Sequence, residues 1–376
     1  MNILLFSVLL AVAAGERVGV LFASFGDVES CACIESYWPK ALEQLVNYEV
    51  PTPPALRPLM AKLIWAAARN DTIAQYTAIS PTCNTSYQTN ARAQASAVVT
   101  ELRKLRPEDV ILPYVGYNFV GGPGCPTNVM VVDQARQALA DGVDTLLLVN
   151  QNNAQQSNTT IGVAYEQLLP ELAKNSSAWK GVRVLGLDDY SQAGGFEALL
   201  ADFVTRQFDT TLGHAGVPAN KTCLLFACHG NPSRITKRGD PGETLMRVNY
   251  ANLSRHFVAR GFDVRLAFQN HGGKGAPFPQ DLFPWSKPPD TEVVPAIATS
   301  AACTHVLITG IISFVVDNSE TLFDEAIDDR RMLAGKPAVV TPSFNADPHF
   351  ATFLAAVTND ALNGKGPVRR LGASHV

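Results

Sequence analysis

The sequence predicts an α/β protein with two similar Rossmann-like domains, each built on a parallel four-stranded sheet flanked by helices. Short β-rich runs alternate along the chain with segments of helical spacing, which favours parallel strands covered on both faces. Most of these runs end in Gly, Asn or Pro, residues that terminate strands. With 376 residues, of which 47% are hydrophobic, the chain can bury one large core or two ordinary ones.

The expected elements follow one another in a regular order. A polar connection at 171–181 separates two groups of strands, so we expect a first domain over 15–178 and a second over 179–345. The β-rich runs occupy residues 17–26, 109–117, 144–150, 182–187, 222–230, 263–270, 304–314 and 337–344, and helical spacing is found at 90–105, 127–142 and 196–208.

The C-terminal segment, 346–376, contains one more helical stretch, at 347–364. This stretch begins with Asp347 and Pro348, residues suited to the N-cap and first helical positions. We expect the segment to pack back on the first domain.

The first fourteen residues form an apolar run that ends in small residues, which is typical of a secretory signal peptide and too short to span a bilayer. An apolar strand extension is the alternative, because the run carries no Lys or Arg. Six N-x-S/T sequons fit a secretory route. They lie at Asn70, Asn84, Asn158, Asn175, Asn220 and Asn252.

Charge and cysteine content exclude some classes of function. A net charge of −4 with no basic run gives no electrostatic footprint for nucleic acid. The seven cysteines lack the spacing of a structural zinc site. An oxidising compartment could pair some of them, but the spacing assigns no pair.

His229 stands at the end of an apolar β-rich run. Because the carboxyl ends of parallel strands line the crevice in which ligands bind, His229 is expected at that edge of the second sheet. Gly230 permits a tight turn there and Pro232 ends strand pairing. A lone histidine is more often structural. A functional role for His229 therefore requires a second reactive side chain near it.

A row of carboxylates supplies the candidate partner. An apolar strand ends near Val316, Asp317 or Asn318 can cap a following helix, and Glu320, Asp324 and Asp328 recur every four residues. That spacing stacks the three side chains on one helical face that begins at the sheet edge of His229. The alternative is a solvated acidic face.

Together these residues resemble the ferrochelatase family, whose members insert ferrous iron into protoporphyrin IX to make protohaem. The family's Ser-Ala-His-x-x-Pro motif corresponds to Ala-Cys-His-Gly-Asn-Pro at 227–232, and the Gly-Asp-Pro after it is found at 239–241. Its Phe-x-x-Asp-His-x-Glu-Thr-Leu stretch is matched at 314–322. A family Gln and Pro-Trp-x-x-Pro correspond to Gln269 and 284–288.

The first half resembles the family less closely. Residues 53–79 are similar to the family's apolar lip segment and the helix after it, and 155–162 to its Gln-x-Ser-x-x-Thr-Thr-Gly turn. The family's Gly-Gly-Pro is replaced by Gly26-Asp27-Val28. Its Gly-Phe-Arg-Tyr-x-His-Pro stretch is found at 116–123 without the arginine and the histidine.

The resemblance implies a diverged chelatase-fold enzyme that takes protoporphyrin IX and ferrous iron as substrates and requires no cofactor. His229 is then the base that accepts a pyrrole proton, with Glu320 as its catalytic partner. The metal-guiding set is His229, Glu320, Asp324 and Asp328. The expected substrate-binding residues are Asn118, Phe119, Trp285, Phe314 and Asn318. The lip at 53–69 is expected to contact a membrane surface.

Two alternatives share this fold. Asn318 stands where the family has a histidine, and asparagine neither titrates nor binds metal well. With the changes at Asn118 and Gly121, it makes a porphyrin- or haem-binding protein without insertion activity credible. A chelatase for another tetrapyrrole and metal is the third possibility. On the enzyme reading, Asn318→His is expected to speed insertion.

The sequence features predict two alternative cellular locations. The N-terminal run and the sequons predict the secretory pathway or the cell exterior. The family resemblance implies a mitochondrion or plastid instead.

Overall fold

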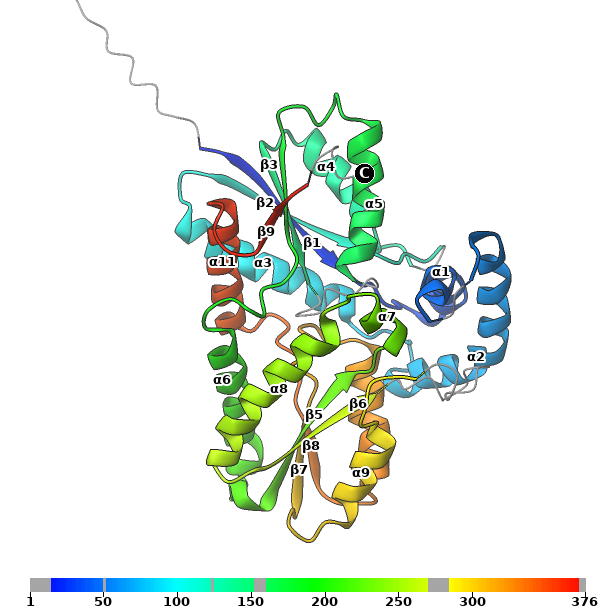
Figure 1. Ribbon diagram of the computed structural model, residues 1–376, viewed down its shortest axis with the longest axis vertical. Coiled ribbons are helices and arrows are strands. Elements are labelled where there is room, and N and C mark those ends of the chain that lie inside the picture. The colour runs from blue at the N-terminus through cyan, green and yellow to red at the C-terminus, as the bar shows by residue number, and fades with distance from the viewer. Residues whose placement is uncertain (1–14, 50–51, 123–124, 152–159, 270–283, 372–376) are drawn as a thin grey trace, which may run out of the picture.

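The computed structural model describes residues 15–49, 52–122, 125–151, 160–269 and 284–371. The expected signal peptide, 1–14, and most of the 155–162 turn lie outside these residues. Two sheets lie one above the other, and β1 and β5 both point toward the middle of the molecule (Figure 1). The α/β class predicted from the sequence is confirmed.

The first sheet has the strand order β2-β1-β3-β4-β9. The first four strands are parallel, as expected, but β9 pairs antiparallel with β4, so the prediction of a four-stranded sheet is one strand short. The strands are β1 (Arg17–Ser24), β2 (Val110–Tyr117), β3 (Thr145–Asn150), β4 (Arg183–Leu187) and β9 (Val368–Arg370).

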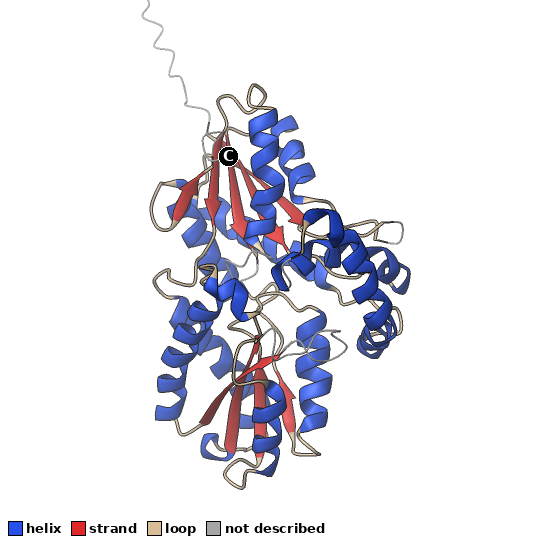
Figure 2. Ribbon diagram, turned by 45° about the vertical axis from the view of Figure 1, so that its right-hand side comes forward, coloured by secondary structure: helices blue, strands red, loops and turns tan. Residues whose placement is uncertain are grey.

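The second sheet is parallel throughout, in the order β6-β5-β7-β8. Its strands are β5 (Thr222–His229), β6 (Asp263–Gln269), β7 (His305–Thr309) and β8 (Ala338–Val340). Helices cover both sheets on both faces, as Figure 2 shows.

The expected domain boundary between residues 178 and 179 needs correction. Strand β4, which that boundary assigns to the second domain, pairs with β3 and belongs to the first sheet. The polar connection at 171–181 is the last part of helix α5 and the turn after it. Polar residues there reflect a solvated helix end and not a linker.

The remaining elements are helical. The α-helices are α1 (Cys31–Glu49), α2 (Arg57–Ile79), α3 (Tyr87–Leu105), α4 (Val131–Ala140), α5 (Ile161–Lys174), α6 (Phe196–Phe208), α7 (Ser233–Lys237), α8 (Gly242–Ala259), α9 (Asp290–Thr299), α10 (Arg330–Met332) and α11 (Pro348–Leu362). Short 3-10 turns lie at Pro54–Leu56 (η1) and Ala219–Lys221 (η3), and π-helical segments at Asp209–Gly213 (η2) and Glu320–Asp329 (η5).

The alternation of side chains along each strand builds the core. Val20 and Phe22 of β1 pack with α3 on one face, whereas Leu21 and Ala23 pack with α4 and α5 on the other. In β5, Phe226 faces α8. One continuous apolar cluster joins the inner faces of both sheets, so the two domains share a core and their carboxyl edges are held together.

The C-terminal segment crosses back to the first domain. The Asp347 side chain accepts hydrogen bonds from the backbone N–H groups of His349 and Phe350, which caps α11 as its sequence predicted. Helix α11 packs against α3, and β9 then extends the first sheet at β4. Among the described residues, none of the helices combines the length and apolarity that a membrane-spanning segment requires.

Candidate active site

His229 and Glu320 form a direct contact at the carboxyl edge of the second sheet. His229 Nδ1 lies 2.9 Å from Glu320 Oε2, and each side chain is about one-quarter exposed, at 24% and 26%. The His229 backbone N–H donates to Ser313 Oγ at 2.9 Å. A side chain at Gly230 would place its Cβ 2.3 Å from the Gln269 carbonyl oxygen, so only glycine fits at this turn.

Two of the expected substrate-binding residues lie near His229. The Phe314 ring meets the His229 ring edge-on, with centroids 6.2 Å apart. Trp285 pairs with Pro232 through a β-bridge, and its ring is within van der Waals reach of the Gly230 position. The structure therefore brings His229, Glu320, Phe314 and Trp285 to one place.

The acidic row lies on a π-helix, where the sequence spacing had indicated an α-helix. In η5 the hydrogen bonds close over five residues instead of four, so residues five apart also share a face. Asp324 and Asp328 are half-buried, and Asp328 pairs with Arg331 at 3.3 Å. The wider turn adds two acids that an α-helical reading did not group with them: Glu325 and Asp329, both completely buried.

Glu325 is the most perturbed of these acids. Burial raises its pKa well above the usual range, and nearby Asp329 raises it further. Neither carboxylate oxygen has a hydrogen-bond partner among the described residues. A Cβ at Gly310 would collide with this carboxyl group, so the glycine at the end of β7 makes room for it. Burial and the neighbouring acid therefore both favour the protonated form of Glu325.

Asn318 holds the start of the π-helix. Its side-chain oxygen accepts hydrogen bonds from the N–H groups of Glu320 and Thr321, each at 3.0 Å. The Asn318 N–H donates in turn to Thr321 Oγ1 at 3.0 Å. This is a capping arrangement, and it fixes the backbone from which Glu320 reaches His229. A substrate-binding role for Asn318 stays a prediction.

Two expected substrate-binding residues of the first domain are buried. Asn118 is 1% exposed and donates from Nδ2 to the Thr160 carbonyl oxygen at 2.6 Å. Phe119 is 3% exposed and packs against Phe25, with ring centroids 4.7 Å apart. Their side chains stabilise the loop after β2, and their proposed contact with substrate stays a prediction.

Sequence reasoning assigned no role to Asp27, which lies after β1 in the first domain. Its carboxylate is buried and accepts a hydrogen bond from the Ser319 N–H of the second domain at 2.9 Å. Burial raises its pKa to about 6. The available signal was an acid at the end of a strand, in a position where the family has glycine.

The cysteines form disulfides at three places within the described residues. The pairs are Cys31–Cys83, Cys33–Cys125 and Cys223–Cys303. The first two pairs connect the start of α1 to the loops before α3 and after β2. Cys228, next to His229, is buried and outside these pairs, and burial raises its pKa to about 12, so it is a neutral thiol.

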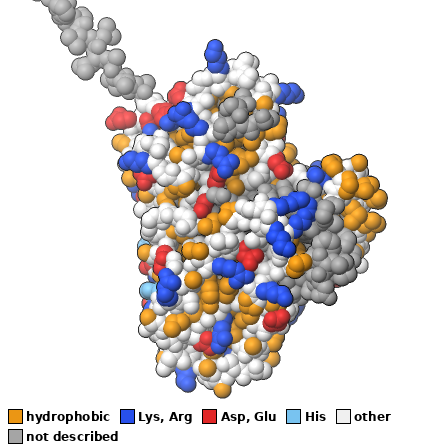
Figure 3. Space-filling model, viewed as in Figure 1, with side chains coloured by type: hydrophobic (Ala, Val, Ile, Leu, Met, Phe, Trp, Pro, Cys, Tyr) orange, Lys and Arg blue, Asp and Glu red, His pale blue; other side chains and the backbone are white. Residues whose placement is uncertain are grey.

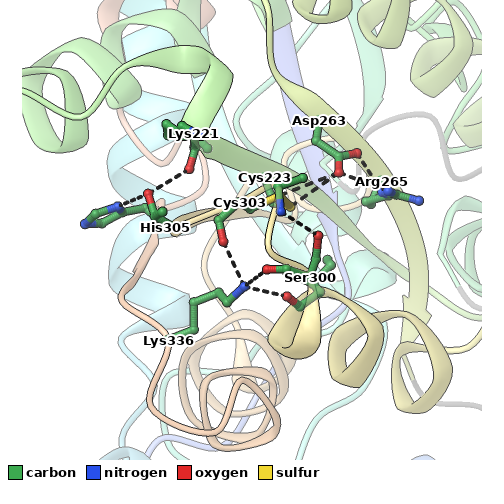
Figure 4. The surroundings of a disulfide bond; sticks show 12 residues. Lys221, Cys223, Asp263, Arg265, Ser300, Cys303, His305 and Lys336 are labelled. Atoms are coloured by element: carbon green, nitrogen blue, oxygen red, sulfur yellow. Dashed lines mark hydrogen bonds and ion pairs between the residues drawn. A yellow bond between two sulfur atoms is a disulfide. The ribbon is translucent and has the colours of Figure 1, made fainter.

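The Cys223–Cys303 disulfide lies at the opposite end of β5 from His229, beside Asp263 (Figure 4). Asp263 Oδ2 is 3.7 Å from Cys223 Sγ and 3.6 Å from Cys303 Sγ, a grouping compact enough for a metal ion. Thiolates ligate metals, whereas these sulfurs are bonded to each other. The group is therefore a structural cross-link, and Lys336 supports it by donating to the Cys303 carbonyl oxygen at 2.8 Å.

Two α/β domains that share one core and meet beside a His–Glu pair, with a carboxylate-rich π-helix behind it, define a two-domain protein of the chelatase class. A family model described as Ferrochelatase matches residues 17–362. The chain belongs to the ferrochelatase family, as its motifs predicted.

Individual relatives are distant. The chain is 26% identical over 143 residues to a ferrochelatase of Chlamydia abortus (strain DSM 27085 / S26/3), covering 38% of this chain and 41% of that protein. It is 26% identical over 137 residues to a ferrochelatase of Chlamydia felis (strain Fe/C-56), covering 36% and 39%. The chain thus spans about two fifths of the length of the curated relatives it matches.

Among solved structures, the chain is similar to CbiX, described as the terminal enzyme for biosynthesis of siroheme in denitrifying bacteria. The identity is 17%, the match covers 72% of this chain and 91% of that one, and the TM-score is 0.40.

Proposed function

We propose that this protein inserts ferrous iron into protoporphyrin IX to form protohaem. Family membership supports a chelatase, and the observation that carries the proposal is the contact between His229 Nδ1 and Glu320 Oε2 beside Phe314 and Trp285. A titratable base, a carboxylate partner and aromatic surfaces suit a flat, apolar macrocycle whose centre must lose protons.

The reaction requires two proton transfers and no electron transfer. Two pyrrole N–H bonds break, iron(II) forms bonds to the macrocycle nitrogens, and two protons leave. In our proposal the His229 imidazole accepts a pyrrole proton, and Glu320 stabilises the imidazolium and passes the proton on. The 2.9 Å contact is within the range for direct proton transfer.

The half-buried acids of η5 are the proposed exit for protons and the entry for the hydrated cation. Asp324 and Asp328 follow Glu320 at four-residue intervals on the π-helix. Oxygen ligands suit this task because they hold first-row divalent metals less tightly than nitrogen or sulfur ligands do. Iron is a substrate here, and the proposal requires no cofactor.

A porphyrin- or haem-binding protein without insertion activity is the second candidate. It is favoured by the first domain, where the 116–123 stretch lacks the family's arginine and histidine and where Asn118 is buried. Another tetrapyrrole and another metal would use the same His–Glu pair, so substrate assays must include alternatives.

The test is an insertion assay with matched variants. Purified protein is incubated with protoporphyrin IX and ferrous or zinc ion, and the change in absorbance is compared with that in buffer. We expect His229→Ala to slow insertion by about 10²–10⁴-fold while porphyrin binding survives. His349→Ala, on the exposed start of α11, is the control histidine and should insert metal like the parent.

A parent protein that binds porphyrin but inserts metal no faster than buffer would overturn the enzyme proposal in favour of the binding protein. Insertion that His229→Ala leaves unchanged would contradict the mechanism.

We also propose that the protein enters the secretory pathway or the cell exterior. The disulfides support an oxidising compartment, because glutathione and thioredoxin keep most cytosolic thiols reduced. Among the sequons, Asn70, Asn84 and Asn220 are exposed and accessible to glycosylation. Glycosidase treatment of protein from its source should increase its mobility on a gel, whereas an unmodified chain found in a mitochondrion or plastid would favour the alternative.

The lip segment is the proposed membrane contact. Leu56, Leu59 and Leu63 are each at least half exposed, and Figure 3 shows apolar side chains gathered on the arm at the right, where α2 projects. Exposed apolar patches of this kind mark interaction surfaces. The double variant Leu59→Asp/Leu63→Asp should reduce co-flotation with phosphatidylcholine vesicles, and equal flotation of parent and variant would exclude this contact.

A further inference from the structure

Asp27 is held rigidly at the junction of the two domains. It follows Gly26, whose φ of +99° favours glycine and whose hypothetical Cβ would lie 2.5 Å from the Phe119 carbonyl oxygen. The Asp27 carbonyl oxygen accepts hydrogen bonds from Gln88 Nε2 and from Asn128 Nδ2. With 3% exposure, the residue has little freedom to move.

The groups that hydrogen-bond to the Asp27 carboxylate are donors. Oδ1 accepts from the Tyr76 hydroxyl at 2.6 Å and from the Val28 N–H at 2.7 Å. Oδ2 accepts from the Ser319 N–H at 2.9 Å. An ionised carboxylate satisfies such a set, whereas an amide would turn its NH₂ group toward at least one of these donors.

These partners come from three parts of the fold. Val28 belongs to the same loop, Tyr76 to the arm helix α2, and Ser319 to the second domain, 292 residues away. Helix α2 also packs against η5. One carboxylate thus joins the first domain, the arm and the start of the π-helix.

Ser319 immediately precedes Glu320. The first N–H groups of a helix have no intrahelical partner, and they attract negative charge. Asn318 satisfies the N–H groups of Glu320 and Thr321 from within the second domain, and Asp27 satisfies that of Ser319 from the first. The backbone position of Glu320 is therefore set from both sides of the junction.

We propose that Asp27 is a positioning residue for insertion: it holds the backbone of Glu320 in register with the first domain, so that the His229–Glu320 pair is aligned with a substrate lying between the domains. This role rests on the proposed function, since it assigns Asp27 to the same site. Asp27 stands at the position where the family motif Gly-Gly-Pro has its second glycine.

The test compares Asp27→Asn with Tyr76→Phe. Asp27→Asn should reduce kcat for metal insertion by about 10- to 100-fold, with KM for porphyrin changed less than about threefold, because small misplacements of reacting groups are costly. Tyr76→Phe removes the hydroxyl's bonds to Oδ1 and to the Ser319 side chain but keeps the bond from the Ser319 N–H to Oδ2, so kcat should fall less than about threefold. Asp27→Gly, the family residue, is the second variant if Asp27→Asn does not fold.

A second readout does not depend on activity. NMR chemical shifts of the His229 ring report its contact with Glu320, and Glu320→Gln provides the reference for losing it. We expect Asp27→Asn to move these shifts toward those of Glu320→Gln, and Tyr76→Phe to leave them near the parent values.

Each outcome is decisive. Unchanged kcat, or His229 shifts identical in Asp27→Asn and the parent, would overturn the positioning role. If the parent inserts no metal, the proposed function fails, while the ring shifts still decide whether Asp27 positions Glu320.

Discussion

The two domains share an architecture but use the carboxyl edges of their sheets differently. In the second domain, apolar strands end in or lead to polar residues that remain partly exposed, such as His229 at the end of β5 and Glu320 beyond β7. In the first domain, the corresponding residues are turned inward: Asp27 after β1 and Asn118 after β2 are buried and hydrogen-bonded.

This difference assigns different tasks to the two halves. The second domain retains the groups that can move protons. Its sequence also matches the family's motifs more closely than the sequence of the first domain does. The first domain has lost charged residues of the family and carries two of the disulfides, Cys31–Cys83 and Cys33–Cys125. We infer that the first domain contributes a rigid support and the second the reacting groups.

The largest effect is expected from removing a disulfide of the first domain. Cys33–Cys125 closes a loop with a sequence separation of 92, so Cys33→Ser/Cys125→Ser should lower the free energy of unfolding by about 4–5 kcal/mol on the chain-entropy estimate. Hydrogen exchange should show the loss in α1 and the neighbouring arm of the first domain, with β5 and β7 still protected.

Cys228→Ala is the matched control, because it removes a buried thiol without cutting a cross-link. It should cost about 1 kcal/mol, the order of a small cavity. Equal losses in the two variants, or loss of protection in β5 before α1, would contradict the division between support and reacting groups.

Much of the fold and of the candidate site could be predicted from the sequence. The alternation of short β-rich runs with segments of helical spacing predicted the α/β class, and Asp347-Pro348 predicted the cap of α11. The sequence also predicts that His229 and Glu320 lie together, because both come at or after the ends of apolar strands and parallel strands bring such residues to one edge.

The remainder depends on long-range contacts or on helix geometry that local patterns do not encode. Strand β9 is three residues long and pairs only because α11 carries it back to β4. Cys33 and Cys125 are far apart in sequence, so spacing gave no pairing. The π-helical turn placed Glu325 in the interior, although an α-helical projection had not grouped it with Glu320.

The next prediction concerns Glu325, the buried acid of η5, and its effect on stability at different pH values. It tests the contrast with the partly exposed acids of the second domain. The folded-state pKa of Glu325 is raised, so the unfolded chain loses its proton near pH 4.3 while the folded chain keeps it. The free energy of unfolding therefore falls as pH rises, by about 1.4 kcal/mol per pH unit, up to the folded-state pKa. Glu325→Gln should remove this loss.

Urea unfolding at several pH values shows whether the free energy of unfolding falls as pH rises. Glu325→Gln should be more stable than the parent at pH 7–8, and the difference should shrink toward pH 4. Glu197→Gln, which removes an exposed charge on α6, controls for net charge. A Glu325→Gln variant that is less stable than the parent at pH 8 would show that the carboxylate is ionised and paired.

The smallest expected effect concerns Asn318, where sequence and structure lead to opposite expectations. The family's histidine suggests that Asn318→His would speed insertion. The structure shows that Asn318 Oδ1 accepts two hydrogen bonds at the start of η5, from the N–H groups of Glu320 and Thr321. A neutral imidazole has one acceptor nitrogen and an imidazolium has none, so Asn318→His should weaken the cap by about 1 kcal/mol. We therefore expect a modest loss of stability and insertion no faster than that of the parent.

Asn318→Asp keeps the acceptor and should retain the stability. Unfolding measurements and the insertion assay on both variants decide the matter: if Asn318→His is as stable as the parent and inserts metal tenfold faster, position 318 acts on the reaction, and its capping role is secondary.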